Sequence, residues 1–206
     1  MILLLQSCAS TQHKSIKAWE KNEWQVVKVD KTEEPTWKIF KRNLKGTDFL
    51  EYKIEGDIQS SPEACLDAFK NDIHKLANGA EDKKYPTYTI SEESEQSLTT
   101  YVIHNEPFPF RNTELSIRYM FHDEANGSKG VSWKESWDDS YIFSSKKLKR
   151  VETFRGSWSF TPITENSSYA YNSVQFDPKG MPLWLVTPMV SKFLKQGLED
   201  IRTTSK

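Results

Sequence analysis

The side chains that could do chemistry are spread thinly along this chain of 206 residues. Its histidines are scattered and stand at His13, His74, His104 and His122. The sequence has no HExxH spacing of a zinc protease, no GxSxG elbow of a serine hydrolase and no CxxC pair. It also has no glycine-rich loop suited to phosphate. We therefore expect a protein that is not an enzyme, with no catalytic residue, no metal and no cofactor.

His104 is the histidine with the most suggestive neighbours. Glu106 or Asp123 could pair with it, and such a pair could move a proton. A histidine on a strand is nevertheless more often held by a neighbour for structural reasons. His74, close to the end of a predicted helix, is interpreted as solvated.

The charge balance excludes one class of partner. The formal net charge is -1, whereas nucleic-acid-binding proteins usually carry a basic surplus, so we expect no nucleic acid. A local basic cluster comprises Lys146, Lys147, Lys149 and Arg150. Such a cluster is drawn to anionic lipid by about 1 kcal/mol per charge. It predicts either a transient contact with a membrane surface or a solvated hairpin loop. The expected assembly is a monomer.

The most apolar stretch is FDPKGMPLWLVTPMVSKFLKQGLEDIR, residues 176–202. It is too short and too interrupted to cross a bilayer, which needs roughly 20 apolar residues. Thr187 followed by Pro188 is typical of a helix start, so we predict a lead-in over 182–187 and a helix over 188–202. Its apolar stripe would consist of Met189, Val190, Phe193, Leu194, Leu198 and Ile201.

The rest of the chain reads mostly as strands. Alternating apolar residues predict them at 24–30, 36–42, 49–59, 88–93, 98–104, 114–123, 131–138, 151–163 and 168–177. One amphipathic helix is predicted over 61–79, with Ser61 as its cap and Pro62 at its first position. Consecutive strands pair antiparallel, which predicts an α+β fold whose curved sheet wraps around the long C-terminal helix.

The N-terminal residues 1–18 are predicted to be a tail, followed by one domain over 19–203. Leu5-Gln6-Ser7-Cys8 is similar to the cleavage site of a bacterial lipoprotein signal, in which Cys8 would receive the lipid. The charged start and full apolar core of such a signal are missing. Two interpretations stay open. With Met1 as the true start the protein would be cytoplasmic, and with an upstream signal it would be a membrane-anchored lipoprotein.

Several ordered motifs resemble one family. They are WQV at 24–26, KIFKR at 38–42, YKIEGDI at 52–58, PFPFRN at 107–112, RVETFRGSWSFTP at 150–162 and FDPKGMPLWL at 176–185. The fifth contains the family's G-x-W-x-x-x-P as Gly156, Trp158 and Pro162. Together they are similar to the START family, the StAR-related lipid-transfer domains of the helix-grip, or Bet v 1-like, superfamily.

The resemblance implies a tunnel for one lipid between the sheet and the C-terminal helix, with that helix and the loop 105–113 as a lid. There is one departure. The family usually has Arg-Asp after the PFP turn, whereas here Asn112 follows Arg111, and a gapless alignment places Thr113-Glu114 at that dipeptide. The family's arginine is therefore shifted or lost, while its later strand arginine matches Arg118.

The candidate site combines an apolar wall with a few polar anchors. Its residues are Tyr101, Ile103, Asn105, Arg118, Met120, Trp133, Glu135, Phe154, Trp158, Phe160, Asn172, Val186, Met189, Val190 and Phe193. Phe154, Gly156, Trp158 and Phe160 share one strand face, which the resemblance places inward; Gly156 would leave room for ligand or let two backbones approach. An inward Arg118 would need Glu135, Glu106 or a lipid head group as its partner.

Three functions compete at this stage. The leading hypothesis is a domain that binds or transfers a lipid or another hydrophobic molecule. The second is an enzyme of the same superfamily, of the polyketide cyclase or dehydrase type, with His104 or Glu135 as acid and base. The third is an envelope lipoprotein whose cavity is filled by its own side chains.

Overall fold

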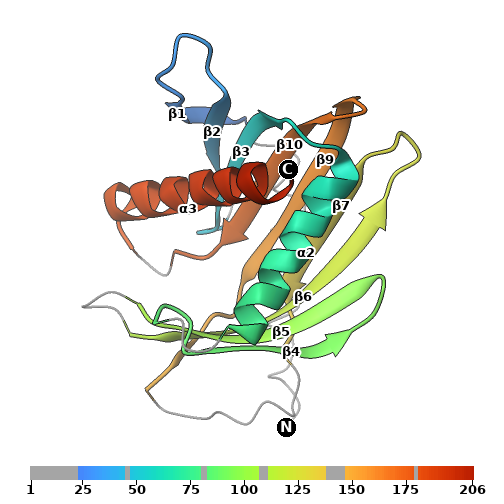
Figure 1. The fold of residues 1–206 in the computed structure, drawn as a ribbon. Coiled ribbons are helices and arrows are strands. Elements are labelled where there is room, and N and C mark those ends of the chain that lie inside the picture. The colour runs from blue at the N-terminus through green and yellow to red at the C-terminus, as the bar shows by residue number, and fades with distance from the viewer. Residues whose placement is uncertain (1–22, 45–46, 80–82, 107–110, 138–146, 179–180) are drawn as a thin grey trace, which may run out of the picture.

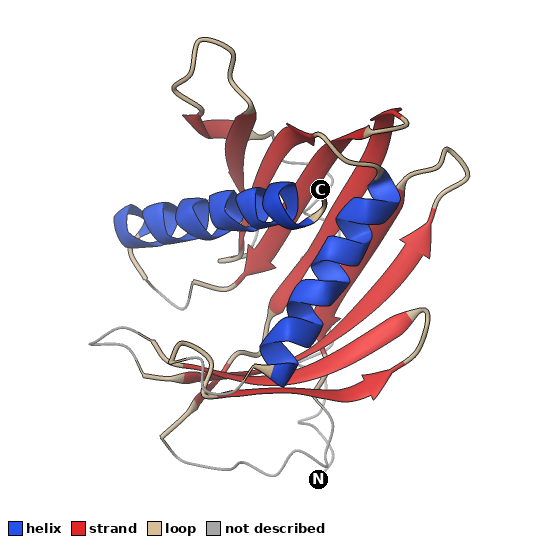
Figure 2. Cartoon of the chain, viewed as in Figure 1, coloured by secondary structure: helices blue, strands red, loops and turns tan. Residues whose placement is uncertain are grey.

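The computed structural model describes residues 23–44, 47–79, 83–106, 111–137, 147–178 and 181–206. Within them, a sheet of 10 strands curves behind two helices that lie on the same face (Figures 1 and 2). Its spatial order is β1-β2-β3-β10-β9-β7-β6-β5-β4, with β8 paired to β6. Every pairing is antiparallel except that of β8 with β6. This confirms the predicted α+β helix-grip fold.

The element boundaries follow the predicted ranges closely. The strands are β1 (Gln25–Val29), β2 (Trp37–Asn43), β3 (Leu50–Ile58), β4 (Thr87–Glu93), β5 (Ser97–His104), β6 (Thr113–Asp123), β7 (Lys129–Glu135), β8 (Lys149–Arg150), β9 (Phe154–Thr164) and β10 (Ser167–Phe176). The helices are α2 (Pro62–Asn78) and α3 (Leu183–Thr204). The short strand β8 was not predicted. The predicted tail, with Cys8, lies outside the described residues, as do Lys146 and residues 107–110 of the proposed lid loop.

Helix α2 begins as the sequence predicts. The Ser61 hydroxyl accepts a hydrogen bond from the Ala64 amide at 3.2 Å, and Pro62 occupies the first turn, where its missing N–H is not needed. Leu66 and Ile73 are buried on the face that meets the sheet. Phe69, on the same stripe, packs against Tyr119 of β6 with ring centroids 5.8 Å apart.

The predicted start of the C-terminal helix is wrong by five residues. Helix α3 begins at Leu183, its N-cap is Pro182, and Pro188 lies inside the helix. The Thr187 hydroxyl does not cap it, because this hydroxyl bonds the phenol of Tyr52 on β3 at 2.8 Å. A proline inside a helix leaves the carbonyl four residues earlier without its usual donor. Here that residue is Trp184, whose side chain is 75% exposed in the first turn.

The two helices meet at one end and diverge at the other (Figure 1). The Ser205 hydroxyl after α3 donates to that of Ser60 before α2 at 2.9 Å. Arg202 donates to the carbonyls of Asp57 and Thr36, at 2.8 and 2.7 Å from its Nη2. The C-terminal end of α3 is thus fastened to β3, to the segment before β2 and to the start of α2. Its N-terminal half lies over the sheet at a distance from α2.

Candidate ligand-binding site

The inner face of the sheet, which the helices cover, carries an apolar lining. Alternation along β9 puts Gly156, Trp158 and Phe160 on this face, and all three are buried. This confirms the predicted common face, with Trp158 and Phe160 stacked at 5.3 Å between centroids. The structure brings these candidate residues together on the inner side of the fold: Trp133, Phe154, Trp158, Phe160, Asn172, Val186 and Val190.

The space over Gly156 is occupied by the protein itself. A Cβ at this position would clash with the Ser173 carbonyl oxygen and with the six-membered ring of Trp133, because it would lie much closer to both than van der Waals contact allows. The glycine is therefore needed for close approach, and the room above it is taken by an indole. The same ring lies 6.4 Å from both Phe69 and Phe154 and 6.3 Å from Tyr119, measured between centroids.

Three polar groups on the inner face lack a partner among the described residues. They are the amide oxygen of Asn172, the indole nitrogen of Trp133 and the hydroxyl of Thr100, whose side chains are buried. Asn172 lies opposite Trp158 in the β9–β10 pairing and close to Gly197 of α3. An unpaired buried polar atom is rare in a native protein and points to a missing partner.

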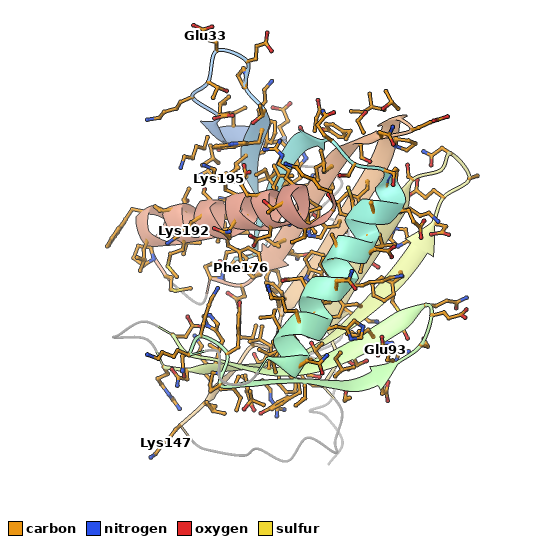
Figure 3. The ribbon with its side chains drawn as sticks, in the orientation of Figure 1. Glu33, Glu93, Lys147, Phe176, Lys192 and Lys195 are labelled. Atoms are coloured by element: carbon orange, nitrogen blue, oxygen red, sulfur yellow. The ribbon has the colours of Figure 1, made fainter. Side chains whose placement is uncertain are left out.

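One edge of α3 exposes apolar side chains. Met189 is 42% exposed and Phe193 is 49% exposed, while the neighbouring Val190 is partly buried against the core. Lys195 stands on the opposite edge and lies over the ring of Trp37 on β2, 5.4 Å from its centroid. The apolar edge therefore faces away from β2. It faces the side of the helix on which Figure 3 shows Phe176, below α3.

Four candidate residues lie on the other face of the sheet. Tyr119 of β6 contacts α2, so its neighbours Arg118 and Met120 point outward. On β5, Tyr101 and Ile103 share that outer face, and the Tyr101 phenol donates to Glu114 at 3.0 Å. Outside the interior, these side chains do not contribute to the cavity that the sequence analysis expected.

The charged side chains among the candidates have partners of their own. Arg118 is 42% exposed and pairs with Glu92 at 4.0 Å, so neither predicted partner, Glu135 nor Glu106, serves it. Glu135 instead binds Arg155, with the shortest N–O distance at 2.5 Å, and both side chains are nearly buried.

The remaining polar candidate, Asn105, belongs to a surface loop. Its side-chain nitrogen donates to the Lys83 carbonyl at 2.7 Å, and its oxygen accepts from Asn112 at the same distance. Asn105 is exposed and does not reach the inner face of the sheet. Of the two asparagines among the candidate residues, only Asn172 lies inside.

His104 pairs with Glu106, one of its two predicted partners, at 2.8 Å from Nδ1 to the carboxylate. The Thr113 hydroxyl donates to the same carboxylate at 2.9 Å. Partial burial opposes ionisation of Glu106, but the hydrogen bonds from His104 and Thr113 outweigh it and lower the pKa of the carboxyl. These polar contacts link the end of β5 to the start of β6.

The His104–Glu106 pair is expected to make a contribution to stability that is lost in acid. Because the pKa of Glu106 is lowered in the folded state, its stabilisation is present above its ordinary value of 4.5 and is lost as the pH falls through the folded value. We expect Glu106→Gln to be less stable than the wild type at pH 7, with the gap closing below pH 4.5. Urea unfolding at several pH values measures this, and a pH-independent gap would contradict it.

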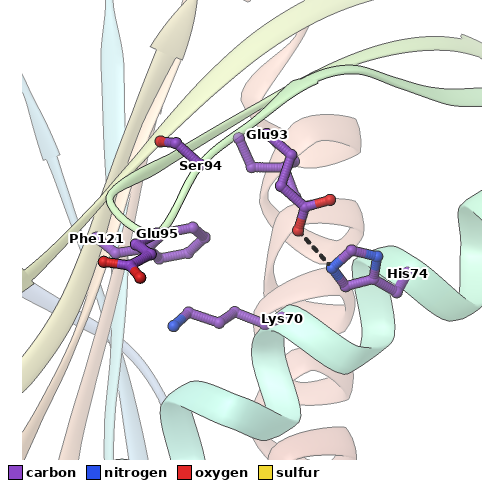
Figure 4. A pocket seen from close by; sticks show the side chains of 7 residues that line it. Lys70, His74, Glu93, Ser94, Glu95 and Phe121 are labelled. Carbon is purple, nitrogen blue, oxygen red and sulfur yellow. Dashed lines mark ion pairs between the residues drawn. The ribbon is translucent and has the colours of Figure 1, made fainter.

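A separate open pocket of 280 Å³ lies between α2 and the β4–β5 turn. It is lined by Lys70, His74, Glu93, Ser94, Glu95, Leu98 and Phe121. The Nε2 atom of His74, a residue predicted to be solvated, lies 2.9 Å from the Glu93 carboxylate across the pocket (Figure 4). The pocket contains none of the candidate residues, and its lining mixes charged side chains with the apolar Leu98 and Phe121.

The described residues contain no group of three metal-ligating side chains, and neither described helix is apolar enough along its length to span a membrane. In the basic cluster, Lys147 and Lys149 are exposed, whereas Arg150 binds Glu114 at 3.1 Å. Arg150 also covers Trp137, 4.0 Å from the ring centroid. One member of this cluster is thus structural.

The candidate list omitted Phe69 and Tyr119, two aromatic residues that pack against Trp133 in the interior. Tyr119 sits between two residues that were chosen, so the choice on β6 was displaced by one position. The sequence signal for the inner face of β6 is its alternation of apolar residues, at Leu115, Ile117, Tyr119 and Phe121.

No protein-family model matches the chain, and no curated protein does. Similarity appears in solved structures. A STAR-related lipid transfer protein from Xanthomonas axonopodis superposes with a TM-score of 0.68 at 14% identity, over 88% of this chain and 98% of that one. The lipid transfer and protein localization domain of human StarD13 gives 0.70 at 11% identity, over 98% and 99%.

A third similar structure is the di-domain ARO/CYC protein BexL, with a TM-score of 0.51 at 8% identity, over 78% of this chain and 52% of that one. At such low identities, the superpositions show that the backbone is arranged in a similar way. The chain has the helix-grip fold of the StAR-related lipid transfer domains.

Proposed function

We propose that this protein binds one hydrophobic molecule, such as a lipid, between the inner face of the sheet and helix α3. The observation that carries the proposal is the apolar edge of α3, where Met189 and Phe193 remain half-exposed beside a buried apolar interior. Covering such side chains yields roughly 25 cal/mol per Å² of apolar area. A guest with an alkyl chain or ring system would gain this energy by lying under the helix.

The fastening of α3 supports exchange of the guest at one end. Arg202 and Ser205 hold the C-terminal end through hydrogen bonds to the sheet and to the segment before α2. The N-terminal half is held by burial of Val186 and by the hydroxyl pair of Thr187 and Tyr52. We propose that this half of α3 lifts to admit the ligand.

A binding role is proposed over a catalytic one. The two acid–base candidates of the cyclase hypothesis are each held by another side chain, His104 by Glu106 and Glu135 by Arg155. They also stand apart, because His104 pairs with Thr113 and Glu135 with Ile117 on β6. Four residues of strand correspond to about 13 Å, a wide separation for two groups acting on one bond.

Native mass spectrometry of the purified protein tests the proposal. We expect the chain to carry one hydrophobic molecule, and a Met189→Ser/Phe193→Ser variant to bind that molecule roughly tenfold more weakly. Both side chains are half-exposed, so the variant should fold normally, within about 1 kcal/mol of the wild type.

The matched control is Lys192→Ser/Lys195→Ser, which makes the same kind of change on the charged side of α3. It should leave ligand occupancy unchanged. A protein that purifies with an empty mass and takes up no lipid would favour a filled interior. Turnover of an added ligand would instead favour the enzyme.

A further inference from the structure

We propose that the ligand is uncharged, with a hydroxyl or carbonyl as its polar group, and that the side-chain amide of Asn172 binds this group. The inference rests on the proposed function, because it assumes a guest between the sheet and α3. It adds the chemistry of the guest's polar end, which a hydrophobic fold alone does not specify.

Asn172 provides the anchor. It is 3% exposed, it lies on the inner face of β10, and its amide oxygen has no partner among the described residues. Its amide nitrogen would stand 3.9 Å from a side chain at Gly197, so the group points at the underside of α3. An amide can accept a hydrogen bond from a hydroxyl or donate one to a carbonyl.

Trp133 adds a second polar group of the same kind. Its indole nitrogen is buried and likewise has no partner in the described part of the chain. Trp133 and Asn172 flank β9 from either side, since Trp133 pairs with Gly156 and Asn172 pairs with Trp158. A single oxygen-bearing group over this part of β9 would therefore have neutral donors and an acceptor near it.

The charges of the interior argue against an ionic head group. Glu135 is neutralised by Arg155, and Glu106 is bound by His104 and Thr113. Arg118, the arginine expected to meet a head group, lies on the outer face with Glu92. An ion placed beside Asn172 would be buried without a countercharge, which is strongly unfavourable.

A series of ligands with one tail and different ends tests the inference. Tryptophan fluorescence titrations of the full chain would compare oleyl alcohol, methyl oleate, oleate, oleylamine and 1-octadecene. We expect the alcohol and the ester to bind roughly 3- to 10-fold more tightly than the octadecene. Oleate and oleylamine should bind at least about 10-fold more weakly than the alcohol.

In the Asn172→Leu variant, the affinity for oleyl alcohol should fall to that for octadecene. The variant should bind octadecene at least as well as the wild type does. Gln175→Leu is the control: it removes another buried amide of β10, 1% exposed, on the opposite face, and should leave the alcohol preference intact. Trp133→Phe, which removes only the indole N–H and some ring area, provides a second variant should Asn172→Leu fail to fold.

The outcomes separate the two proposals. Equal binding of oleate and oleyl alcohol, or an alcohol preference that survives both Asn172→Leu and Trp133→Phe, would overturn the inference while leaving a hydrophobic binding protein. Binding of none of the five compounds would count against the proposed function and the inference together.

Discussion

Replacing Gly156 with alanine should destabilise the protein by about 3 kcal/mol or more, because the new methyl group has no space. Its position falls inside the contact distance of the Ser173 carbonyl, which belongs to the paired strand β10, and of the Trp133 ring. Backbone cannot move aside as a flexible side chain can. The substitution must therefore push β9 from β10 or expel the indole from the core.

Urea unfolding followed by fluorescence measures this loss. Gly197→Ala is the matched control, since a Cβ there would sit at 3.6 Å from Trp158 and 3.9 Å from Asn172, which are ordinary contacts. In the middle of a helix, glycine to alanine should instead stabilise by roughly 0.5–1 kcal/mol. If the two variants lost similar stability, the close approach at Gly156 would not be the cause.

Breaking the ion pair between Arg155 and Glu135 is expected to have the second largest effect. The side chains are 16% and 12% exposed, and the carboxylate accepts from the guanidinium at 2.5 Å and from the Phe154 amide at 3.4 Å. Arg155→Met would leave Glu135 nearly buried without its countercharge. We expect a loss of about 3 kcal/mol, at the lower end for buried pairs because water still reaches both groups.

A double-mutant cycle identifies the origin of this loss. Arg155→Met/Glu135→Leu should recover most of the stability, since neither charge remains. Arg118→Met serves as a comparison on the half-exposed pair with Glu92 at 4.0 Å, and should cost no more than about 0.5 kcal/mol. Additive losses in the Arg155 and Glu135 variants would refute a direct pairing.

The cycle also bears on function. If Glu135 acted as an acid or base, the double variant would regain stability but lose turnover of any substrate. If Glu135 is only the partner of Arg155, the same variant should bind the ligand as the wild type does. Stability and ligand binding measured on one set of proteins thus distinguish the cyclase hypothesis from the binding hypothesis.

Elements with a strong local signal were predictable from the sequence. The cap of α2 at Ser61 and the apolar alternation of β9 and β10 depend on neighbours in the chain, and the structure has them where they were expected. The motifs around Gly156 and Trp158 were also sufficient to indicate the family fold. The start of α3 was misplaced because Thr187 before Pro188 has the pattern of a cap, whereas its hydroxyl is bound by Tyr52, 135 residues away.

The sequence by itself determined the architecture, because strand alternation, helix periodicity and turn residues act over a few positions. Only the tertiary structure decided which side chains share the interior. A shift of one residue on β5 and β6 reverses every side chain, so Tyr119 lies inside and Arg118 outside. Likewise, strand pairing across β7, β9 and β10 sets Trp133 over Gly156 and buries the amide oxygen of Asn172 without a partner among the described residues. Such contacts join residues far apart in the chain, and no local pattern encodes them.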